Sequence, residues 1–342
     1  MEIRRARLVE KGWDRALGIE AGEAPAPTGD EVLVALEASG VCHRDLLDRD
    51  GRFPFLRLPV TPGHEGAGYV IAVGERVTDW RVGDRVGTMH RDSCGACPAC
   101  VAGATSLCVG AAFVLGLLAD GTYATHLVAP QSALYALPSS DELGAAEAAV
   151  LHCTFGTAYR DLVTLGAMKA GERVLITGAN GGVGAAAVQI AARLGAEAIA
   201  VVRDARHEAF VREMGAARVV VSPENRFHEQ IGDRVDLALD TVGEPTFGAA
   251  LRALRVGGRV VIVGNVTPAR VQLNLGYLIT FGLSIVGGSG ATRAEMAALI
   301  AMHRERPWRV PIAKRLPLDE AEAAQRAVRA GGLQGRVALV PA

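Results

Sequence analysis

The sequence predicts an α/β protein with two parts, a β-rich, barrel-like part and a doubly wound parallel sheet. Short apolar runs broken by Gly and Pro fill residues 4–138, as expected for a barrel of short strands. From residue 172 onwards, apolar strands alternate with helices, which is the pattern of a parallel sheet. The length of 342 residues also favours two domains.

The composition excludes several classes of protein. Half of the residues are hydrophobic, 21% are charged and the formal net charge is −1, so no broad attraction to nucleic acid or anionic membranes is indicated. We see no signal peptide, and the most apolar window, residues 184–202, is interrupted by Gln189, Arg193 and Glu197. We therefore expect a cytoplasmic protein that acts on a small molecule and has no nucleic-acid or membrane partner.

The β-rich part is expected to begin with short strands and turns. Strands are predicted over residues 4–9, 31–38, 68–74 and 82–86, a turn-rich connector at 24–30 and a short helix at 45–50. Further strand and turn follow at 127–138, and an alanine-rich helix at 142–151.

A thiol and an imidazole stand 22 residues apart in this part of the chain. Cys42 precedes Asp45 by three residues, and His64 is followed by Glu65. Both ligand types suit zinc, and a catalytic zinc takes three protein ligands and keeps one position open. Alone, such a pair is more often a buried cysteine and a structural histidine, so a third ligand has to be found.

Four cysteines within 15 residues form the most specific local pattern. Their spacing is C-x2-C-x2-C-x7-C, at Cys94, Cys97, Cys100 and Cys108. Four thiolates can close a tetrahedral ion with no open position, which describes a structural zinc. An iron–sulfur cluster, disulfides or free thiols are the alternatives. We predict zinc, because clustered cysteines in a long chain without a secretion signal indicate metal ligands.

Cys153 is the sixth cysteine and follows the alanine-rich helix. With four cysteines assigned to the lobe, Cys42 and Cys153 remain, and His64 can join them. Two zinc ions per chain would then account for every cysteine. The alternative is that Cys153 is a buried helix cysteine.

A glycine-rich turn lies between a strand at residues 173–177 and a helix at 185–194, and a second strand follows at 198–202. Glycine there lets the backbone approach a pyrophosphate, and the helix N-terminus stabilises its charge. The turn therefore predicts a dinucleotide site that includes Gly178, Gly181, Gly182, Val183 and Gly184.

The alternation of strands and helices continues to the end of this part. Strands are expected at 217–221, 235–240, 258–263 and 284–289, with helices at 207–214 and 245–254. Thr241, Val242 and Gly264 follow two of these strands, where such sheets bind their ligands. The tail adds helices at 293–304 and 318–330 and strands between and after them, the last at 336–340.

The residues after the second strand bear on the choice of cofactor. NAD binding usually places an acidic residue about 20 residues beyond the glycines. Arg203 and Arg206 could hold a 2′-phosphate, whereas Asp204 could bind the ribose of NAD. We favour NADP over NAD.

The order of these motifs resembles the zinc-dependent alcohol dehydrogenases of the medium-chain dehydrogenase/reductase family. Gly-Val-Cys-His-Arg-Asp at 40–45 is followed by Pro-Gly-His-Glu-Gly-Ala-Gly at 62–68, the cysteine lobe, a cysteine four residues before a threonine, and Gly-Gly-Val-Gly at 181–184. The resemblance covers essentially the whole chain. It implies a GroES-like catalytic domain at 1–153 and 290–342, with the zinc lobe at about 90–110, around a Rossmann domain at 154–289. It also implies homo-oligomers, either dimers or tetramers.

The resemblance assigns roles to single residues. It makes Cys42, His64 and Cys153 the ligands of the catalytic zinc. Glu65 is similar to a carboxylate that can approach this zinc, and Asp45 to the carboxylate that orients His64.

On the cofactor side, the resemblance places Thr157 and Val266 at the nicotinamide. Arg336 resembles a C-terminal basic residue that reaches the pyrophosphate. The four lobe cysteines match the structural zinc of the family.

The proton relay departs from the family pattern. The family usually has a Ser or Thr two residues after the first cysteine ligand, and often a His three residues beyond, but here these positions hold Arg44 and Leu47. Arginine stays protonated and only donates, so it cannot relay a proton. His43 could shuttle the proton or contact cofactor phosphates. Arg44 could meet a charged substrate group, contact those phosphates or face solvent.

We predict a zinc-dependent oxidoreductase that transfers a hydride between NAD(P)(H) and an alcohol, aldehyde or ketone carbon, with zinc polarising the substrate oxygen. The alternative is NADPH-dependent conjugate reduction of a 2-enoyl substrate, because relatives with Cys-x-Arg-Asp resemble acryloyl-CoA reductases and need no alcohol relay. A non-enzymatic scaffold is disfavoured, since it would gain nothing from an open metal site. Candidates for an apolar substrate pocket are Phe53, Phe55, Phe113 and Leu115, although core packing is the commoner role for each.

Overall fold

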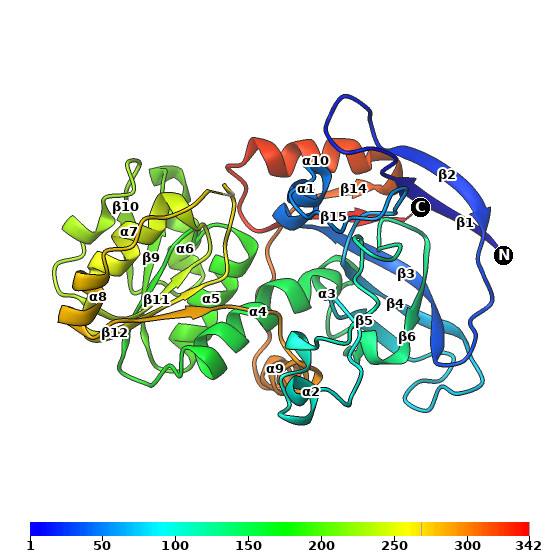
Figure 1. The fold of residues 1–342 in the computed structure, drawn as a ribbon, viewed down its shortest axis with the longest axis horizontal. Coiled ribbons are helices and arrows are strands. Elements are labelled where there is room, and N and C mark those ends of the chain that lie inside the picture. The colour runs from blue at the N-terminus through cyan, green and yellow to red at the C-terminus, as the bar shows by residue number, and fades with distance from the viewer. Residues whose placement is uncertain (268, 342) are drawn as a thin grey trace. The chain divides into compact units, whose positions relative to one another are not determined.

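The computed structural model describes residues 1–267 and 269–341 and divides into two compact units. The first unit contains Met1–Cys153, Thr292–Pro307 and the C-terminal residues from Ile312. The second contains Thr154–Ala291 and Trp308–Pro311. In Figure 1 the first unit runs from blue to cyan and ends in orange and red, and the second is green to yellow.

The first unit is built on a seven-stranded, mostly antiparallel sheet. Its order is β14-β15-β3-β4-β5-β7, and β6 pairs with β3 off this path. The strands are β3 (Glu31–Val41), β4 (Glu65–Val73), β5 (Arg85–Thr88), β6 (His126–Pro130), β7 (Leu134–Ala136), β14 (Ile312–Pro317) and β15 (Arg336–Val340). A separate antiparallel pair consists of β1 (Glu2–Arg7) and β2 (Gly18–Glu23). The register of β3 on β4 shifts twice, and such bulges bend a strand and increase its twist.

The first unit also contains helices. They are α1 (His43–Arg49), α2 (Pro98–Val101), α3 (Ala145–Leu151), α9 (Arg293–Glu305) and α10 (Ala321–Ala330). Shorter 3-10 turns span Thr105–Leu107, Gln131–Ala133 and Leu318–Glu320, and a π-helical turn spans His152–Gly156. α3 packs against β3 and β4, so its C-terminal end lies close to the carboxyl end of β3 and the start of β4.

Both faces of the sheet carry apolar side chains. Val32, Val34 and Leu36 alternate along β3 and pack with Val70 in one cluster. Val41 at the end of the same strand belongs to a second cluster that includes residues of β15. A strand that is buried on both sides is held firmly in place, which matters because the metal-ligand candidates lie at its end.

The second unit is a six-stranded parallel sheet in the order β10-β9-β8-β11-β12-β13. The strands are β8 (Arg173–Ile176), β9 (Glu197–Val202), β10 (Arg218–Val221), β11 (Val235–Asp240), β12 (Leu254–Ile262) and β13 (Ser284–Gly287). Its helices are α4 (Thr157–Tyr159), α5 (Gly182–Arg193), α6 (Glu208–Glu213), α7 (Glu244–Ala253) and α8 (Leu275–Phe281). Shorter turns span Arg160–Leu165, Ala205–His207 and Phe227–Glu229. This is the doubly wound order, and its switch point lies between β8 and β11.

The predicted fold class is confirmed, a β-rich part combined with a doubly wound parallel sheet. Several elements differ from the expectation. β2 and α8 were not predicted, and β5 begins at Arg85 because residues 82–84 form the preceding turn. Residues 308–311, expected in the first part, join the second unit, where the Trp308 ring packs on Phe155 and beneath Arg193.

Candidate functional site

Cys42, His64, Glu65 and Cys153 meet in the first unit, although the sequence separates them widely. One ligand atom of each lies within 4.8 Å of the others, and all four residues are buried. The Cys153 Sγ lies 3.9 Å from the Cys42 Sγ and 3.6 Å from the His64 Nε2. The structure thus brings together the three predicted zinc ligands and their neighbouring carboxylate.

The sheet positions these side chains. Cys42 follows β3 and precedes α1, while Cys153 follows α3. His64 and Glu65 lie at the start of β4, where Gly40 of β3 faces Glu65. A Cβ atom on Gly40 would lie only 2.2 Å from a Glu65 carboxylate oxygen, so glycine at this position makes room for the buried carboxylate.

Asp45 fixes the orientation of His64. One Asp45 oxygen lies 2.9 Å from His64 Nδ1. The other accepts hydrogen bonds from the Cys42 N–H and the Tyr123 hydroxyl, both at 2.9 Å. With Nδ1 engaged, Nε2 is directed at the thiols. Tyr123 is a functional residue that the sequence reasoning missed, because it belongs to no motif.

Arg336 also reaches this cluster. Its Nη2 lies 2.8 Å from a Glu65 oxygen, 3.2 Å from the Cys153 Sγ and 3.4 Å from the Cys42 Sγ. The sequence prediction placed Arg336 at a pyrophosphate, whereas the structure holds its guanidinium against the thiols. The reason is its place on β15, the strand next to β3, whose end carries Cys42.

The charges in the cluster shift its pKa values. Burial raises the pKa of the Glu65 carboxyl to about 7, although the charge of Arg336 lowers it. A hydrogen bond with Cys153 lowers the pKa of the Cys42 thiol well below its usual range, and Arg336 adds to the shift. One thiol of the pair is therefore prepared to be a thiolate, the form that binds metal.

The donor set fits a zinc ion. It offers two thiols, one imidazole nitrogen and one carboxylate. The buried Glu65 carboxylate is paired with the Arg336 guanidinium, and neither of its oxygens accepts a hydrogen bond of good geometry, so it could also approach a metal ion. Three ligands, Cys42, His64 and Cys153, would leave one position open, as in catalytic zinc sites.

Arg44 and Leu47 stand where the family has its proton relay, and hydrogen bonds within the protein fix the Arg44 side chain. The Arg44 Nε donates to Asp48 Oδ2 at 3.0 Å, and its Nη2 donates to the Leu115 carbonyl at 2.6 Å. The Arg44 side chain is 22% exposed and is therefore only partly open to solvent. His43 is the first residue of α1, and Leu47 lies on the same helix.

His90 stands beside the cluster and was not predicted. Its ring contacts the His64 ring edge-on at 4.9 Å between centroids, and the His152 ring at 4.5 Å. Burial and the neighbouring histidines hold the pKa of His90 well below its usual value, so the ring is neutral near pH 7. A single histidine between a strand and the cysteine lobe carries no sequence signal that would have identified it.

The four lobe cysteines form a second donor cluster. Their ligand atoms also lie within 4.8 Å of one another, and all six cysteines of the chain are free. The Cys97 N–H donates to the Cys94 Sγ at 3.3 Å, and the Cys94 N–H to the Cys108 Sγ at 3.3 Å. Backbone donors lower the pKa of the Cys97 thiol to about 6. Four sulfur donors fit a closed tetrahedral zinc, and the disulfide alternative is wrong.

In the second unit, the glycine turn connects β8 to α5. Gly178 has a φ of +56°, and a Cβ there would lie 2.6 Å from the Thr241 Oγ1. A Cβ on Gly184 would lie 2.3 Å from the Gly178 carbonyl oxygen, so glycine there lets the first turn of α5, which begins at Gly182, approach the turn closely. Gly181 caps this helix, and Val183 lies in its first turn.

The ends of neighbouring strands meet at this turn. The Val266 N–H donates to the Val242 carbonyl at 2.9 Å, and Gly264 packs against the Thr241 backbone so closely that a Cβ would not fit. Thr157 lies at the start of α4 and is buried. The predicted cofactor-binding residues other than Arg336 are therefore all in the second unit, and the glycine turn adjoins the ends of β11 and β12.

Asp240 is a buried residue that the sequence reasoning missed at this edge. One of its oxygens accepts hydrogen bonds from the Thr177 hydroxyl, the Thr246 hydroxyl and the Val242 and Gly243 N–H groups. It thereby ties the end of β8 to the end of β11 at the switch point. The sequence feature that could have identified Asp240 is its place at the carboxyl end of a buried strand.

Arg203, Asp204 and Arg206 follow β9 and are exposed. Asp204 accepts a hydrogen bond from the Arg206 N–H at 2.9 Å, and its other oxygen pairs with the Arg206 Nε at 3.1 Å. Asp204 is thus engaged with Arg206 in this structure.

The proposed apolar pocket residues are mostly packing residues. Leu115 is fully buried, and Phe113 packs against the same core cluster. Phe53 packs on the other cluster of the first unit and stacks at 5.7 Å with Phe55, which is half exposed. Core packing is therefore the role of Leu115, Phe113 and Phe53.

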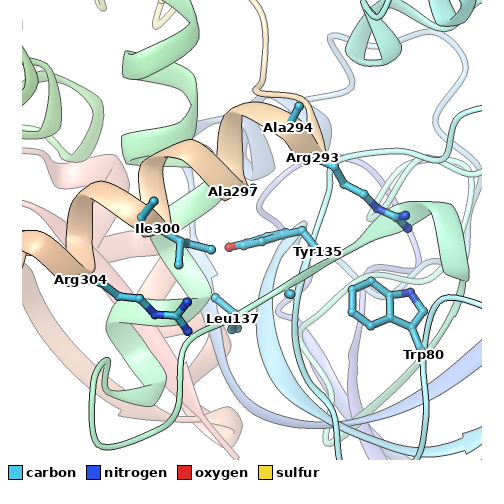
Figure 2. A pocket seen from close by; sticks show the side chains of 10 residues that line it. Trp80, Tyr135, Leu137, Arg293, Ala294, Ala297, Ile300 and Arg304 are labelled. Carbon is cyan, nitrogen blue, oxygen red and sulfur yellow. The ribbon is translucent and has the colours of Figure 1, made fainter.

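A separate cavity of about 460 Å³ lies along α9 in the first unit. Figure 2 shows Tyr135 and Trp80 facing that helix, with Arg293 and Arg304 at its two ends. Both arginines are already paired, Arg293 with Asp79 at 2.7 Å and Arg304 with Glu142 at 3.0 Å. None of the predicted metal ligands lines this cavity.

Comparisons with known proteins give consistent results. The model of the alcohol dehydrogenase GroES-like domain matches residues 28–139, and the model of the zinc-binding dehydrogenase matches residues 182–305. The chain is 32% identical to the acryloyl-coenzyme A reductase of Sulfurisphaera tokodaii, with 98% of this chain and 99% of the relative covered. It is also 32% identical to an alcohol dehydrogenase of Geobacillus stearothermophilus, with the same shares covered.

Among solved structures, AibC matches with a TM-score of 0.93 and 38% identity, covering 100% of this chain and 96% of that one. Among the residues that the structure describes, every helix is too short or too polar to cross a membrane.

Proposed function

Since the chain belongs to the zinc-dependent alcohol dehydrogenases of the medium-chain dehydrogenase/reductase family and is an oxidoreductase, we propose that it transfers a hydride between NAD(P)(H) and the carbon of an alcohol, aldehyde or ketone. The observation that carries this proposal is the buried set of Cys42, His64 and Cys153 together with the carboxylate that orients His64. A bound zinc supplies a Lewis acid that polarises the substrate oxygen.

The residues around the set have separate tasks in this proposal. Asp45 holds the His64 ring by its Nδ1, which leaves Nε2 for the metal. The guanidinium of Arg336 balances the negative charge of the thiolates and of Glu65 inside the buried cluster. Glu65 is the carboxylate that lies close enough to approach a metal ion held by Cys42, His64 and Cys153. The lobe cysteines would hold a second, structural zinc, which gives two zinc ions per chain.

The proton has to take another route than the family relay. Arg44 is committed to Asp48 and the Leu115 carbonyl, and arginine does not release a proton. Leu47 has no polar group. We therefore propose that exchange with solvent runs through His43 on the first turn of α1 or through water.

The cofactor would bind in the second unit, at the glycine turn. Gly181 and the following N–H groups of α5 provide a helix N-terminus for the pyrophosphate. We propose NADP over NAD, because Asp204 is engaged by Arg206 while Arg203 and Arg206 offer two exposed guanidiniums after β9.

Conjugate reduction of a 2-enoyl substrate is the second candidate. It is favoured by the replacement of the relay by Arg44 and Leu47, because a proton delivered to carbon needs no hydroxyl relay to the zinc site. The similarity to an acryloyl-coenzyme A reductase supports the same reaction class.

One experiment separates the two reactions. The purified chain is incubated with cinnamaldehyde and NADPH, and separately with NADH, and the product is identified by mass and NMR rather than by loss of absorbance. Cinnamyl alcohol supports hydride transfer to the carbonyl carbon. Hydrocinnamaldehyde shows conjugate reduction and overturns the first proposal. The Cys153→Ala variant serves as the control for activity that does not depend on the metal site.

We also propose a cytoplasmic homodimer that pairs through β13. β13 is an edge strand of the sheet, and its outer residues are exposed. Large apolar side chains around it are exposed as well, notably Ile279 at 80% and Leu275 at 65%. Light scattering should give twice the chain mass for the wild type and the chain mass for Ile285→Asp, whereas an unchanged mass for the variant would place the interface elsewhere.

A further inference from the structure

A second concave site lies in the second unit, away from the glycine turn. This cavity has a volume of about 270 Å³ and is lined by His228, Gly232, Arg234, Arg252 and Tyr277. His228 belongs to the turn before β11, Arg234 immediately precedes β11, and Arg252 lies in the last turn of α7. Tyr277 projects from α8, which packs beside β12.

The cavity and the glycine turn lie at opposite ends of the strands of the parallel sheet. β8 and β11 run in the same direction, with Leu237 opposite Val174. The glycine turn follows the carboxyl end of β8, whereas the cavity precedes the amino end of β11. A dinucleotide bound at the glycine turn therefore leaves this cavity free.

The cavity collects the positive charge of Arg234 and Arg252. The Arg234 Nη1 donates to the Leu254 carbonyl at 3.1 Å and to the Arg252 carbonyl, so its position is fixed without an acidic partner. Within residues 1–267 and 269–341, neither Arg234 nor Arg252 forms an ion pair with a carboxylate, and no acidic residue lines the cavity. Of the acidic residues nearby in the sequence, Glu229 lies 3.8 Å from the His228 Nε2 and is bound by Arg226 at 2.6 Å, and Asp233 lies 3.9 Å from Arg173.

Two further polar groups complete the lining. The His228 Nδ1 is buried and has no hydrogen-bond partner. The Tyr277 hydroxyl lies 3.5 Å from the Arg234 Nη1. Burial and the charge of Arg252 lower the pKa of His228, which agrees with the closeness of these groups.

We propose that this cavity binds a phosphate group, either inorganic phosphate or the phosphate of a small monoester. Two guanidiniums, a hydroxyl and an imidazole nitrogen supply hydrogen-bond donors, and the planar fork of arginine matches phosphate oxygens. The volume lies below the usual range for drug-sized ligands, so the site suits a compact anion rather than a dinucleotide. Binding would stabilise the folded unit by linking the turn before β11 to α7 and α8.

The test is calorimetric titration with inorganic phosphate at constant ionic strength, balanced with sodium chloride. The full chain, loaded with zinc and saturated with NADPH, is used so that the glycine turn is occupied. We expect one phosphate per chain, and affinity about tenfold weaker for Arg252→Gln, because a charged donor is removed. Tyr277→Phe, which removes only the hydroxyl, should show a smaller loss.

Arg212→Gln is the matched control, since Arg212 is an exposed arginine of α6 in the same unit. It should bind phosphate like the wild type. A parallel titration with glycerol phosphate identifies the source, because tighter binding than inorganic phosphate indicates a monoester and equal or weaker binding indicates the free ion. No phosphate binding, or equal affinity in wild type and Arg252→Gln, overturns the proposal, and its failure leaves the oxidoreductase assignment untouched.

Discussion

The two cysteine clusters of the first unit are built in different ways. The lobe takes all its donors from 15 consecutive residues and lies partly exposed. The other cluster takes its donors from the ends of β3 and α3 and the start of β4, and all of them are buried. Cys42 and Cys153 are 111 residues apart in the chain.

From this difference we expect that the lobe needs its metal to fold, whereas the fold itself prepares the buried cluster. In the buried cluster, Asp45 and Tyr123 fix His64 through hydrogen bonds that need no metal. The lobe instead exposes apolar side chains, with Val101 at 77% and Val109 at 83%, so it has little core of its own. Its shape must come largely from the thiolates and the ion that they would share.

The largest expected effect follows from breaking the buried cluster. Cys153→Ala removes one of three ligands, so we expect activity below detection and a fall from two zinc ions to one per chain. Because the sheet and Asp45 hold the rest of the site, the unfolding midpoint should change little. Metal analysis and calorimetry check both parts. A variant that keeps two zinc ions, or that fails to fold, contradicts the comparison.

Breaking the lobe should have the opposite pattern. Cys97→Ser should also lose one zinc ion, but here we expect the unfolding midpoint to fall by about 5 °C and proteases to cut near residues 90–110. Turnover per remaining zinc ion should stay close to the wild type. If Cys97→Ser and Cys153→Ala behave alike in both stability and activity, the distinction between the two clusters is lost.

The same contrast explains what the sequence could predict. The lobe was recognisable from spacing alone, because its geometry is local. For the buried cluster, the cysteine count only suggested that Cys42, Cys153 and His64 belong together, and the family resemblance gave them their role as zinc ligands, since nothing local connects Cys153 to Cys42. The fold class followed from strand and helix periodicity, whereas β2 was missed because its sequence, Gly-Ile-Glu-Ala-Gly-Glu, is mostly exposed and polar.

The residues that were missed share a physical cause. Tyr123 and His90 act through contacts with elements far away in the chain, which periodicity does not encode. Arg336 was assigned to a pyrophosphate by resemblance, and that role stays a prediction, while the pairing of β15 with β3 accounts for its contact with the thiols in this structure. The contacts of these three residues depend on neighbours that are close only in the folded chain, and local sequence patterns do not contain that information.

We expect an intermediate effect from a change in Asp45, the residue that orients His64 in the buried cluster. Asp45→Asn keeps the size of the side chain but puts an NH2 group, which cannot accept a hydrogen bond, opposite the His64 Nδ1, so activity or zinc affinity should fall by about 10- to 100-fold. The fold should survive, because Asn can still accept from the Cys42 N–H and the Tyr123 hydroxyl. Zinc competition with a chromogenic chelator measures the affinity.

Asp14→Asn is the control for this variant, since Asp14 is exposed and distant from the cluster in the sequence. It should match the wild type in zinc affinity. Wild-type affinity and activity in Asp45→Asn would show that His64 is oriented by the backbone alone.

The smallest effect concerns the reactivity of the thiols in zinc-free protein. Where the zinc-free lobe keeps its backbone donors, they lower the pKa of the Cys97 thiol to about 6, so near pH 7 it is mostly thiolate. Lowering the pH through 6 should protonate it and slow its reaction with a disulfide reagent. Cys42 and Cys153 should react slowly throughout because both are buried, even though the pKa of Cys42 is also lowered. Mass spectrometry after short exposure should therefore find label in the lobe first. Equal labelling of both clusters would mean that the buried site opens without its metal, and that the fold does not prepare it.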